Sequence, residues 1–444
     1  MSGYDVIIIG SGPGGYAAAL KACKSGMRTA LVEKDLVGGT CINWGCVPTK
    51  VLIKYAKLKN VAPATEYSEA RDKCLKIASE RRGKLELLFK EAGISLHAGA
   101  ARLTGVNEIE LDPSGEKLTG KNIIIATGFN PNRIDGVEYD GADIVTVREA
   151  LRFEKPPASA VIVGSGATGM EIATVWNSFG TKVTVLEKLP CIMGLDDDVL
   201  SKTAEDHFRD SGIQILTGVN IESIVKTAAG VEVKFSAGSG AGANSGANPG
   251  VSAGSGATKL VAEKAMIAAG VSPNSGGIGL EAIGVEMDRG SINIDGGMRT
   301  NIPGIYAIGD VTGKLALAMA ASIQGMSAAG SIAGEDIKTP VYENIPRCVF
   351  SGIEAAFVGL SERQAEQRGF SAVTTRRPFK PYGKPVKPGE GEGIIKVVAD
   401  AKTNKALGAV MLGYDATDQI AIPTRLIQLG AAAADVINSV CDVR

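Results

Sequence analysis

The sequence predicts an α/β protein that contains two doubly wound parallel sheets and a C-terminal α+β segment. A strand, a glycine-rich loop, a helix and a second strand follow one another near the N-terminus, and the same order returns from residue 159. Beyond Pro340, strands at 355–358, 393–398 and 406–412 and a helix at 416–429 follow no such loop, which indicates a separate α+β domain. A chain of 444 residues is long enough for about two to four domains.

Composition narrows the classes of function. The formal net charge is −1 and no long basic run occurs, so nucleic acid is not an expected partner. The longest apolar runs, such as 315–323, are shorter than the ~20 residues of a membrane span, and the first five residues lack the basic head of a signal peptide. The seven cysteines are scattered and odd in number, as in proteins of a reducing compartment. We therefore expect a cytoplasmic protein that does not act at a membrane.

The N-terminal repeat has every part of a dinucleotide-binding fingerprint. A buried strand at 5–9 leads into the loop Gly10–Gly15, a helix at 16–25 follows, and a strand at 29–33 ends in an acid. The glycines allow a tight turn and close approach of a pyrophosphate, and the helix N-terminus faces that anion. Glu33 is placed to bind a ribose hydroxyl. The alternative is a glycine-rich turn without a ligand.

The second repeat has the same parts. A strand at 159–163 precedes the loop and helix start at 164–171, and a strand at 182–187 again ends in an acid. Two Rossmann-type dinucleotide sites are therefore expected. Glu187 stands where a 2′-phosphate would lie, so charge repulsion favours NAD over NADP.

Two later strands end in turns that suit a cofactor. The strand at 121–125 leads into Ala126-Thr127-Gly128, where backbone amides can approach a ligand, and the strand at 302–308 ends in Gly309-Asp310. Asp310 can accept hydrogen bonds from a polyol such as a ribityl chain, although a plain turn aspartate is the alternative. Helices are predicted at 51–95 and, rich in small residues, at 315–329.

The stretch Gly38–Lys50 places Cys41 and Cys46 five residues apart, just after the first dinucleotide unit. A cysteine pair beside a bound redox cofactor can pass two electrons between that cofactor and a thiol. The alternative is two unrelated cysteines in a loop.

Together these motifs resemble those of class I pyridine nucleotide-disulfide oxidoreductases, and most closely those of dihydrolipoamide dehydrogenases. The matches are GGTCxNxGCxPxK, both GxGxxG loops with Glu171, Ala126–Gly128, Gly309-Asp310 and Ala416–Asp418, and they span nearly the whole chain. The resemblance implies FAD at the first site, NAD at the second and a homodimer formed through the last domain. It further implies an FAD-binding domain at 1–150 and 275–340, an NAD-binding domain at 151–274 and an interface domain at 341–444.

The resemblance also implies roles for single residues. Cys41 would exchange with a dithiol substrate, and Cys46 would lie against the flavin as the charge-transfer thiolate of a redox-active disulfide. Lys50 and Glu171 would form an ion pair near the flavin N5 atom. The implied FAD contacts are Gly10, Gly12, Gly14, Gly15, Glu33, Lys34, Gly39, Thr40, Lys50, Thr127, Gly128, Asp310, Ala316, Leu317 and Ala318. The implied NAD contacts are Gly164, Gly166, Gly169, Glu171, Glu187 and Gly270.

A bridge between Cys41 and Cys46 needs a distorted backbone, because residues five apart lie on different sides of a regular helix. We expect Gly45 and the restriction that Pro48 places on Val47 to supply the distortion. Such a bridge suits reversible exchange better than a structural role.

The sequence also departs from the family pattern. Family members have a His, followed five residues later by Glu, near the C-terminus as an acid–base pair for the partner subunit's cysteines, and the present chain ends at Arg444, about where that His would begin. Its two histidines, His97 and His207, are expected to be ordinary surface residues. Met319 replaces a family histidine beside the flavin. Trp44 is bulky for its loop, where we expect it to pack; the alternative is that it narrows the approach of the dithiol.

The leading prediction is an FAD- and NAD-dependent enzyme that oxidises dihydrolipoamide-type dithiols, slowed by the missing acid–base pair. The lipoyl group would be carried by a second protein. The alternatives are an NADH diaphorase with another acceptor, and a catalytically silent subunit kept for assembly. Residues 236–257 are almost wholly Gly, Ala, Ser and Asn and predict an expanded hairpin loop without a function.

Overall fold

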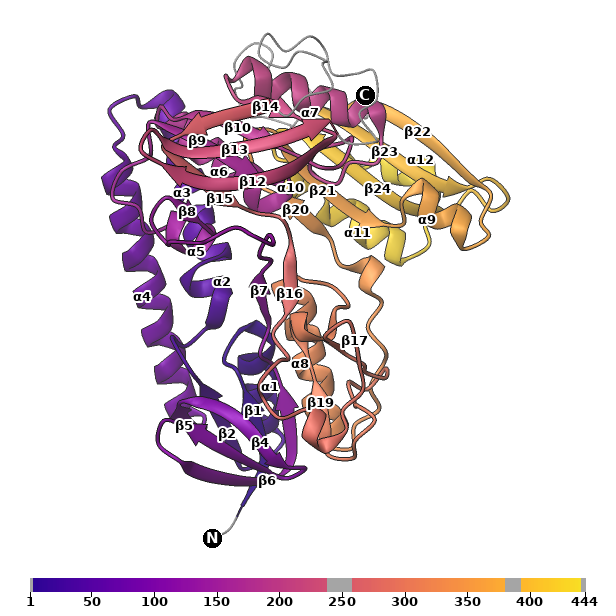
Figure 1. Ribbon diagram of the computed structural model, residues 1–444. Coiled ribbons are helices and arrows are strands. Elements are labelled where there is room, and N and C mark those ends of the chain that lie inside the picture. Colours follow the sequence, from indigo (N-terminus) through magenta and orange to yellow (C-terminus); the bar gives the residue numbers. More distant parts are fainter. Residues whose placement is uncertain (1–2, 238–257, 380–392, 441–444) are drawn as a thin grey trace. The chain divides into compact units, whose positions relative to one another are not determined.

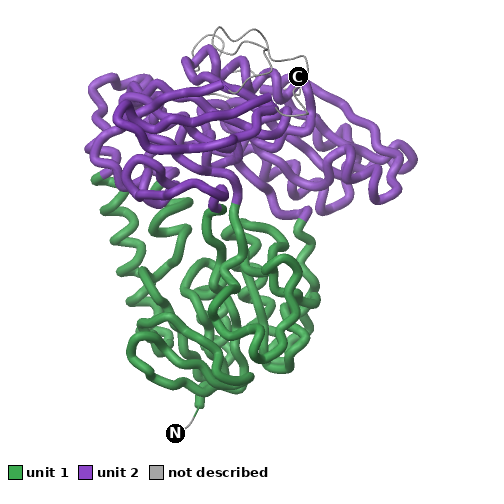
Figure 2. The backbone as a smooth tube through the Cα atoms, viewed as in Figure 1, with its two compact units in different colours: residues 1–48, 72–132, 271–342 green, residues 49–71, 133–270, 343–444 purple. Residues whose placement is uncertain are grey.

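The computed structural model describes residues 3–237, 258–379 and 393–440, so the insertion predicted at 236–257 lies almost wholly outside the described residues. The chain divides into two compact units, coloured separately in Figure 2. Unit 1 comprises residues 1–48, 72–132 and 271–342, and unit 2 comprises residues 49–71, 133–270 and 343–444.

Unit 1 is built on a seven-stranded sheet (Figure 1). Its central strands are parallel because helices connect them, and the strands at its far edge form an antiparallel meander. In spatial order they are β3 (Ser95–Ala98), β2 (Thr29–Glu33), β1 (Tyr4–Ile9), β6 (Glu116–Ile125), β5 (Glu108–Asp112) and β4 (Ala100–Gly105), with β19 (Ile305–Ala307) also paired to β6.

The core of unit 1 lies on both faces of this sheet. Ile7 and Ile9 point to one face and Val6 and Ile8 to the other, and all four are buried. The helices of this unit include α1 (Pro13–Lys24), α2 (Gly39–Asn43), most of α4 (Tyr67–Glu91) and α8 (Ala318–Ile332), with 3₁₀ turns η1 (Glu281–Ile283), η2 (Gly309–Thr312) and η3, which begins at Tyr342. Two short ribbons complete the unit, β7 (Phe129–Pro131) with β16 (Val271–Pro273) and β17 (Met287–Asp288) with β18 (Ser291–Ile292).

Unit 2 repeats the parallel arrangement and adds two antiparallel sheets. The parallel sheet has the order β11 (Gln214–Leu216), β10 (Lys182–Leu186), β9 (Ser159–Val163), β15 (Lys264–Ile267) and β8 (Ile144–Val145), and a three-stranded sheet holds β12 (Val219–Thr227), β13 (Gly230–Ala237) and β14 (Thr258–Ala262). The last sheet has the order β20 (Arg347–Val349), β21 (Glu354–Gly359), β24 (Ala406–Gly413), β23 (Gly393–Asp400) and β22 (Ala372–Phe379). The helices are most of α3 (Cys46–Val61), α5 (Val147–Ala150), α6 (Ala167–Ser178), α7 (Asp198–Asp210), α9 (Glu362–Gln367), α10 (Ala416–Gln419), α11 (Ala421–Gln428) and α12 (Ala433–Asn438).

The predicted fold class is confirmed, with corrections to four helices. The helix expected at 16–25 is α1, which begins at Pro13 and ends at Lys24. The helix expected at 51–95 is two helices, α3 and α4, and the chain is already in β3 at Ser95. The helix expected at 416–429 is divided after Gln419, because Pro423 has no N–H to bond the carbonyl of that residue. The small-residue helix begins at Ala318 rather than Leu315. The predicted domain boundaries remain predictions.

Among the described residues no helix is both long and apolar enough to cross a membrane.

Candidate active site

The first glycine loop follows β1 and has the geometry of a phosphate cradle. Gly10 has a φ of +106°, and a Cβ atom there would lie 2.4 Å from the Ala126 carbonyl oxygen. A Cβ on Gly15 would lie 1.8 Å from the Gly10 carbonyl oxygen, so only glycine allows the helix to start this close to the strand. Around Gly12, the N-cap of α1, a Cβ would meet open space. The loop therefore leaves the helix N-terminus open to an anion.

The acid at the end of β2 is fixed by the same loop. Oε2 of Glu33 accepts hydrogen bonds from the Ser11 amide at 3.0 Å and the Ser11 hydroxyl at 2.6 Å, and Oε1 accepts one from the Asp35 amide at 2.9 Å. A carboxylate has room for about four hydrogen bonds, so Glu33 retains capacity for a ribose hydroxyl.

The second loop reproduces this arrangement closely. Gly164 has a φ of +104°, and a Cβ there would lie 2.4 Å from the Ala268 carbonyl oxygen. A Cβ on Gly169 would meet the Gly164 carbonyl oxygen at 2.0 Å, whereas Gly166 faces open space. Oε2 of Glu187 accepts hydrogen bonds from the Ser165 amide at 2.8 Å and the Ser165 hydroxyl at 2.6 Å. The two repeats thus share the serine that orients the acid.

Sequence reasoning passed over Ser11 and Ser165. Each is the serine of a GSG triplet at the same position of its repeat, and aligning the two loops would have revealed them.

Two buried polar atoms of unit 1 have no hydrogen-bond partner among the described residues. They are the Thr127 hydroxyl oxygen and Oδ1 of Asp310. Burial raises the pKa of Asp310 to about 6. Buried polar groups are nearly always paired, so two such atoms, in the turns after β6 and β19, indicate a place for a polar ligand. Together with the open space at Gly12 and Gly128, they fit a dinucleotide with a polyol segment.

The cysteine stretch lies directly on the first loop. The Gly38 amide donates to the Ser11 hydroxyl at 3.0 Å, and a Cβ on Gly39 would come within 2.9 Å of the Gly12 Cα. Cys41 lies in α2 and is half-buried, whereas Cys46 begins α3 and is exposed. Burial first, and then the charges of Cys41 and Cys46, raise the pKa of Tyr16 in α1.

The helix breaks between the two cysteines, at Trp44 and Gly45. Trp44 ends α2 with a φ of −145°, and a Cβ on Gly45 would lie 3.1 Å from the Thr40 carbonyl oxygen. The prediction that Pro48 distorts Val47 is wrong, because both residues lie in the first turn of α3. Proline is tolerated there, since the first N–H groups of a helix have no intrahelical partner.

Lys50 and Glu171 form a bidentate ion pair within unit 2. The Lys50 Nζ lies 2.9 Å and 2.8 Å from the two carboxylate oxygens, and Glu171 is only 3% exposed. The Phe350 amide also donates to Oε1 of Glu171 at 3.0 Å, and the Phe350 ring lies 4.8 Å from the Lys50 Nζ. The carboxylate is thereby held by an amide of the last sheet's β20 region as well as by the lysine.

The predicted site residues fall into the two units as follows. Unit 1 holds Gly10, Gly12, Gly14, Gly15, Glu33, Lys34, Gly39, Thr40, Cys41, Cys46, Thr127, Gly128, Asp310, Ala316, Leu317 and Ala318. Unit 2 holds Lys50, Gly164, Gly166, Gly169, Glu171, Glu187 and Gly270.

The histidines are less simple than predicted. His97 is half-buried, with its Nε2 3.1 Å from the Tyr4 hydroxyl and its Nδ1 3.4 Å from a Glu116 carboxylate oxygen. His207 is also half-buried and packs edge-to-face against Phe208. The expectation of ordinary surface histidines is therefore wrong. Met319 is 55% exposed in the first turn of α8.

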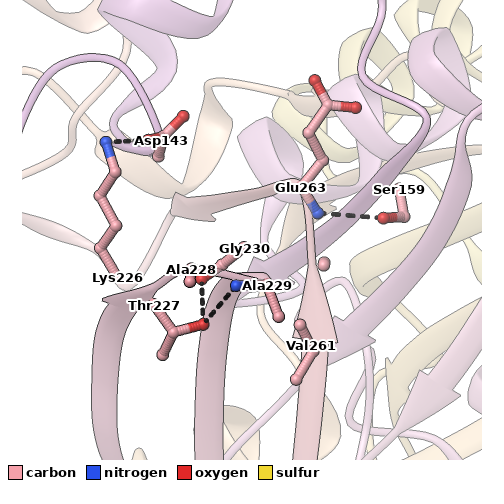
Figure 3. Close-up of a pocket in the computed structure, with 10 residues that line it drawn as sticks. Asp143, Ser159, Lys226, Thr227, Ala228, Ala229, Gly230, Val261 and Glu263 are labelled. Carbon is pink, nitrogen blue, oxygen red and sulfur yellow. Dashed lines mark hydrogen bonds and ion pairs between the residues drawn. The ribbon is translucent and has the colours of Figure 1, made fainter.

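A pocket of about 470 Å³ lies elsewhere in unit 2, by the ends of β12 to β14 (Figure 3). Lys226 forms an ion pair with Asp143, and the Glu263 amide donates to the Ser159 hydroxyl at 3.0 Å. None of the predicted site residues lines this pocket, so it is not the candidate site.

Comparison with known proteins decides the family. Residues 4–325 match the model described as pyridine nucleotide-disulphide oxidoreductase, and residues 345–442 match the dimerisation domain of the same family. The chain belongs to the pyridine nucleotide-disulphide oxidoreductase family. It is an NAD-dependent flavoprotein enzyme, and the predictions of FAD and NAD as cofactors are confirmed.

Curated relatives in this family span nearly the same length. The chain is 36% identical to a dihydrolipoyl dehydrogenase of Chlorobaculum tepidum, with 98% of this chain and 93% of that protein covered. It is 35% identical to a dihydrolipoyl dehydrogenase of Mycobacterium leprae, with 99% and 95% covered. Among solved structures, the Cu(II) complex of the HOCl-induced flavoprotein disulfide reductase RclA from Escherichia coli has a TM-score of 0.84 at 25% identity and covers 98% of this chain and 95% of that one.

Proposed function

We propose that the chain oxidises dihydrolipoamide-type dithiols with NAD through a redox-active disulfide between Cys41 and Cys46. The observation that supports this most is the seating of the cysteine stretch on the first glycine loop, through Gly38 on Ser11 and Gly39 against Gly12. A cysteine pair on this loop would lie next to the dinucleotide that the loop binds, which we propose is FAD.

The chain's thiols would act in two exchange steps. A substrate thiolate attacks the sulfur of Cys41, the bond between Cys41 and Cys46 breaks, and Cys46 leaves as a thiolate. The second substrate thiolate then attacks the substrate sulfur of the mixed disulfide, which closes the substrate's disulfide and releases Cys41 as a thiolate. Two protons leave the substrate, and its electron pair is held by the two cysteines. FAD, when bound, would supply the two-electron redox chemistry that links these two cysteines to NAD.

The cofactor contacts named from the sequence form the binding part of the proposal. Glu33 would bind the adenosine ribose of FAD. The buried oxygens of Thr127 and Asp310 would form hydrogen bonds with other parts of FAD, Asp310 with the ribityl chain. Glu187 would bind the ribose of NAD. Lys50 follows Cys46 by one helical turn in α3, and Glu171 orients its cation.

The domain assignment and partners also belong to the proposal. We assign FAD binding to 1–150 and 275–340, NAD binding to 151–274 and the homodimer interface to 341–444. The match of residues 345–442 to a dimerisation domain supports the last assignment. The substrate dithiol would be a lipoyl group on a carrier protein, since the curated relatives are named dihydrolipoyl dehydrogenases.

The dithiol reaction is expected to be slow in the polypeptide of residues 1–444. Neither His97 nor His207 has a glutamate five residues later, and the structure gives both of them other neighbours. A general base contributes typically ~10²–10⁴-fold to the rate. Dihydrolipoamide turnover by the polypeptide of residues 1–444 should therefore be lower by about that factor than turnover by a family member that has the acid–base pair. Reduction of the flavin and of artificial acceptors by NADH should remain fast.

Absorption spectroscopy with cysteine variants tests the proposal. Two-electron reduction of the wild-type protein should produce a long-wavelength band, and Cys46→Ser should abolish that band. Cys41→Ser should abolish dihydrolipoamide turnover and leave reduction by NADH intact, while Cys191→Ser, a half-buried cysteine of unit 2, serves as the control. Turnover by Cys41→Ser within tenfold of wild type would overturn the exchange mechanism. Flavin reduced without the band supports an NADH diaphorase, and purified protein without flavin supports a silent assembly subunit.

A further inference from the structure

Gln324 is a buried polar residue that takes no part in the proposed dithiol exchange or cofactor contacts. It lies in the second turn of α8 and is 1% exposed. Burying an amide side chain is unfavourable unless all its polar groups are hydrogen-bonded. The partners of Gln324 therefore indicate what it does in the fold.

Its partners hold the turn that contains Asp310. Oε1 of Gln324 accepts a hydrogen bond from the Gly309 amide at 2.5 Å. Nε2 donates to the Tyr342 hydroxyl at 2.7 Å and lies 3.5 Å from the Thr312 hydroxyl, which itself donates to the Gly309 carbonyl at 2.7 Å. Gly309 has a φ of +73°, so the chain leaves β19 abruptly there, and its amide has no partner from a regular ladder. Gln324 supplies that partner.

An adjacent face of α8 packs against the first glycine loop. A Cβ on Gly325 would lie 2.3 Å from the Gly14 carbonyl oxygen, and a Cβ on Gly14 would lie 3.0 Å from the Ala321 carbonyl oxygen. The helices α1 and α8 therefore meet backbone to backbone, and α8 has little freedom to slide. One helix thus contacts the glycine loop through Gly325 and the Asp310 turn through Gln324.

We propose that Gln324 is a positioning residue that sets Asp310 at a fixed place relative to the first glycine loop, so that both contact FAD at once. The inference rests on the assignment of Asp310 to FAD in the proposed function. Asp310 itself makes the contact, and Gln324 acts only through it.

The test measures FAD affinity in a double-mutant cycle on the full chain. FAD dissociation constants are determined by flavin fluorescence for the wild type, Gln324→Leu, Asp310→Asn and the double variant, and the melting temperature of each apoprotein is recorded. Leucine has a similar size and leaves the Gly309 amide unpaired, so Gln324→Leu should weaken FAD binding about 10-fold. In the Asp310→Asn background the same change should weaken it by less than about 3-fold, because the positioned group is already altered.

Two further variants keep the test decisive. Tyr342→Phe removes only the outer hydrogen bond of the network and should weaken FAD binding by about 3-fold with the fold intact, which covers the case in which Gln324→Leu does not fold. Met326→Leu alters an exposed side chain of the same helix, and its FAD affinity should equal that of the wild type.

The outcomes distinguish the assignment of Asp310 to FAD from the positioning role of Gln324. Asp310→Asn with unchanged FAD affinity would overturn the assignment of Asp310. If Asp310→Asn weakens FAD binding but Gln324→Leu has an equal effect in both backgrounds, the positioning role is overturned and the assignment stands. A lower melting temperature of the apoprotein with unchanged FAD affinity in Gln324→Leu and Tyr342→Phe would show a purely structural role.

Discussion

Asp310 combines burial, a missing partner and a raised pKa in one carboxyl group. Its Oδ1 has no partner within the described residues, and burial raises its pKa from 3.8 to about 6. A carboxyl group with a raised pKa in the folded state contributes stability below the pKa of the unfolded chain, and that contribution is lost as the pH rises through about 6. At neutral pH the apoprotein therefore holds a destabilising charge.

This predicts that Asp310→Asn stabilises the apoprotein. At pH 8 the free energy of unfolding should rise by about 3 kcal/mol, because asparagine avoids the buried charge. The gain should vanish below about pH 3, where Asp310 is protonated in both the folded and the unfolded state. Urea unfolding of both apoproteins across this range measures the difference, and a less stable variant at pH 8 would contradict the argument.

The Glu187 carboxylate, unlike Oδ1 of Asp310, has hydrogen-bond partners. It accepts three hydrogen bonds, two from Ser165 and one from Leu189. Its orientation is set before any ligand arrives. The same holds for Glu33 and Ser11 in the first repeat.

At the scale of elements, α7 is attached to the last sheet through the residue that caps it. Asp197 accepts from the Val199 and Leu200 amides at 3.1 Å and pairs with Arg376 and Lys396 of β22 and β23. Burial alone would raise the pKa of Asp197, but the two cations outweigh it and hold the pKa at about 2. This group stabilises the fold above pH 3.8, and the stabilisation is lost as the pH falls through about 2.

Asp197→Asn should therefore destabilise the protein in a pH-dependent manner. Asparagine is also a good N-cap, so the change removes mainly the charge. The free energy of unfolding should fall by about 2 kcal/mol at pH 7 and by progressively less below pH 4. Chemical denaturation at pH 7, 4 and 3 checks this, and a loss that does not change with pH would assign the effect to packing.

The helix α3 presents two lysines one heptad apart to two buried carboxylates. Lys50 pairs with Glu171, and Lys57 pairs with Glu354, which also accepts from the Thr417 hydroxyl at 2.6 Å. Both carboxylates lie in unit 2 and are nearly inaccessible, at 3% and 5% exposure. Two ion pairs on one face fix the rotation of this helix.

Lys57→Met is expected to lower the free energy of unfolding by about 3 kcal/mol, since a buried carboxylate loses its counter-ion. The double variant Lys57→Met/Glu354→Gln should be more stable than the single one, because no charge is left unpaired. Thermal unfolding measures both, with Lys54→Met on the exposed face of α3 as the control. Equal losses in the single and double variants would refute the role of the ion pair.

On the scale of the whole molecule, the same dinucleotide-binding motif occurs twice in the chain. Each unit has a parallel sheet, a loop with left-handed glycine, and an acid held by the serine of that loop. The parallel connection places both loops at the carboxyl ends of their strands, where ligands of such sheets bind.

The two acids should therefore control the two cofactors separately. Glu187→Ala should raise the KM for NADH about 10-fold or more and leave the FAD content unchanged, because a hydrogen bond to a charged group contributes about 1.5–3 kcal/mol. Glu33→Ala should reduce the FAD content instead. Flavin absorbance per protein and steady-state kinetics distinguish the effects, and loss of FAD from Glu187→Ala would contradict the separation.

Prediction from the sequence succeeded where the signal was local. The strand at 159–163 was predicted with the bounds that the structure shows, because a β-branched run before a glycine loop is itself the signal. The division of the helix at Pro423 was missed although the proline was visible. Gln324 was missed because a glutamine in a helix of small residues carries no local sign of burial.

The sequence by itself determined the two glycine loops, the acids that end their strands and the cysteine motif, since each depends on neighbours within about 30 residues. Only the tertiary structure decided which groups pair with the buried charges. Asp197 pairs with Arg376, 179 residues away, and Lys57 pairs with Glu354, 297 residues away. A buried polar group must find a partner wherever the fold supplies one, and no spacing along the chain encodes that choice.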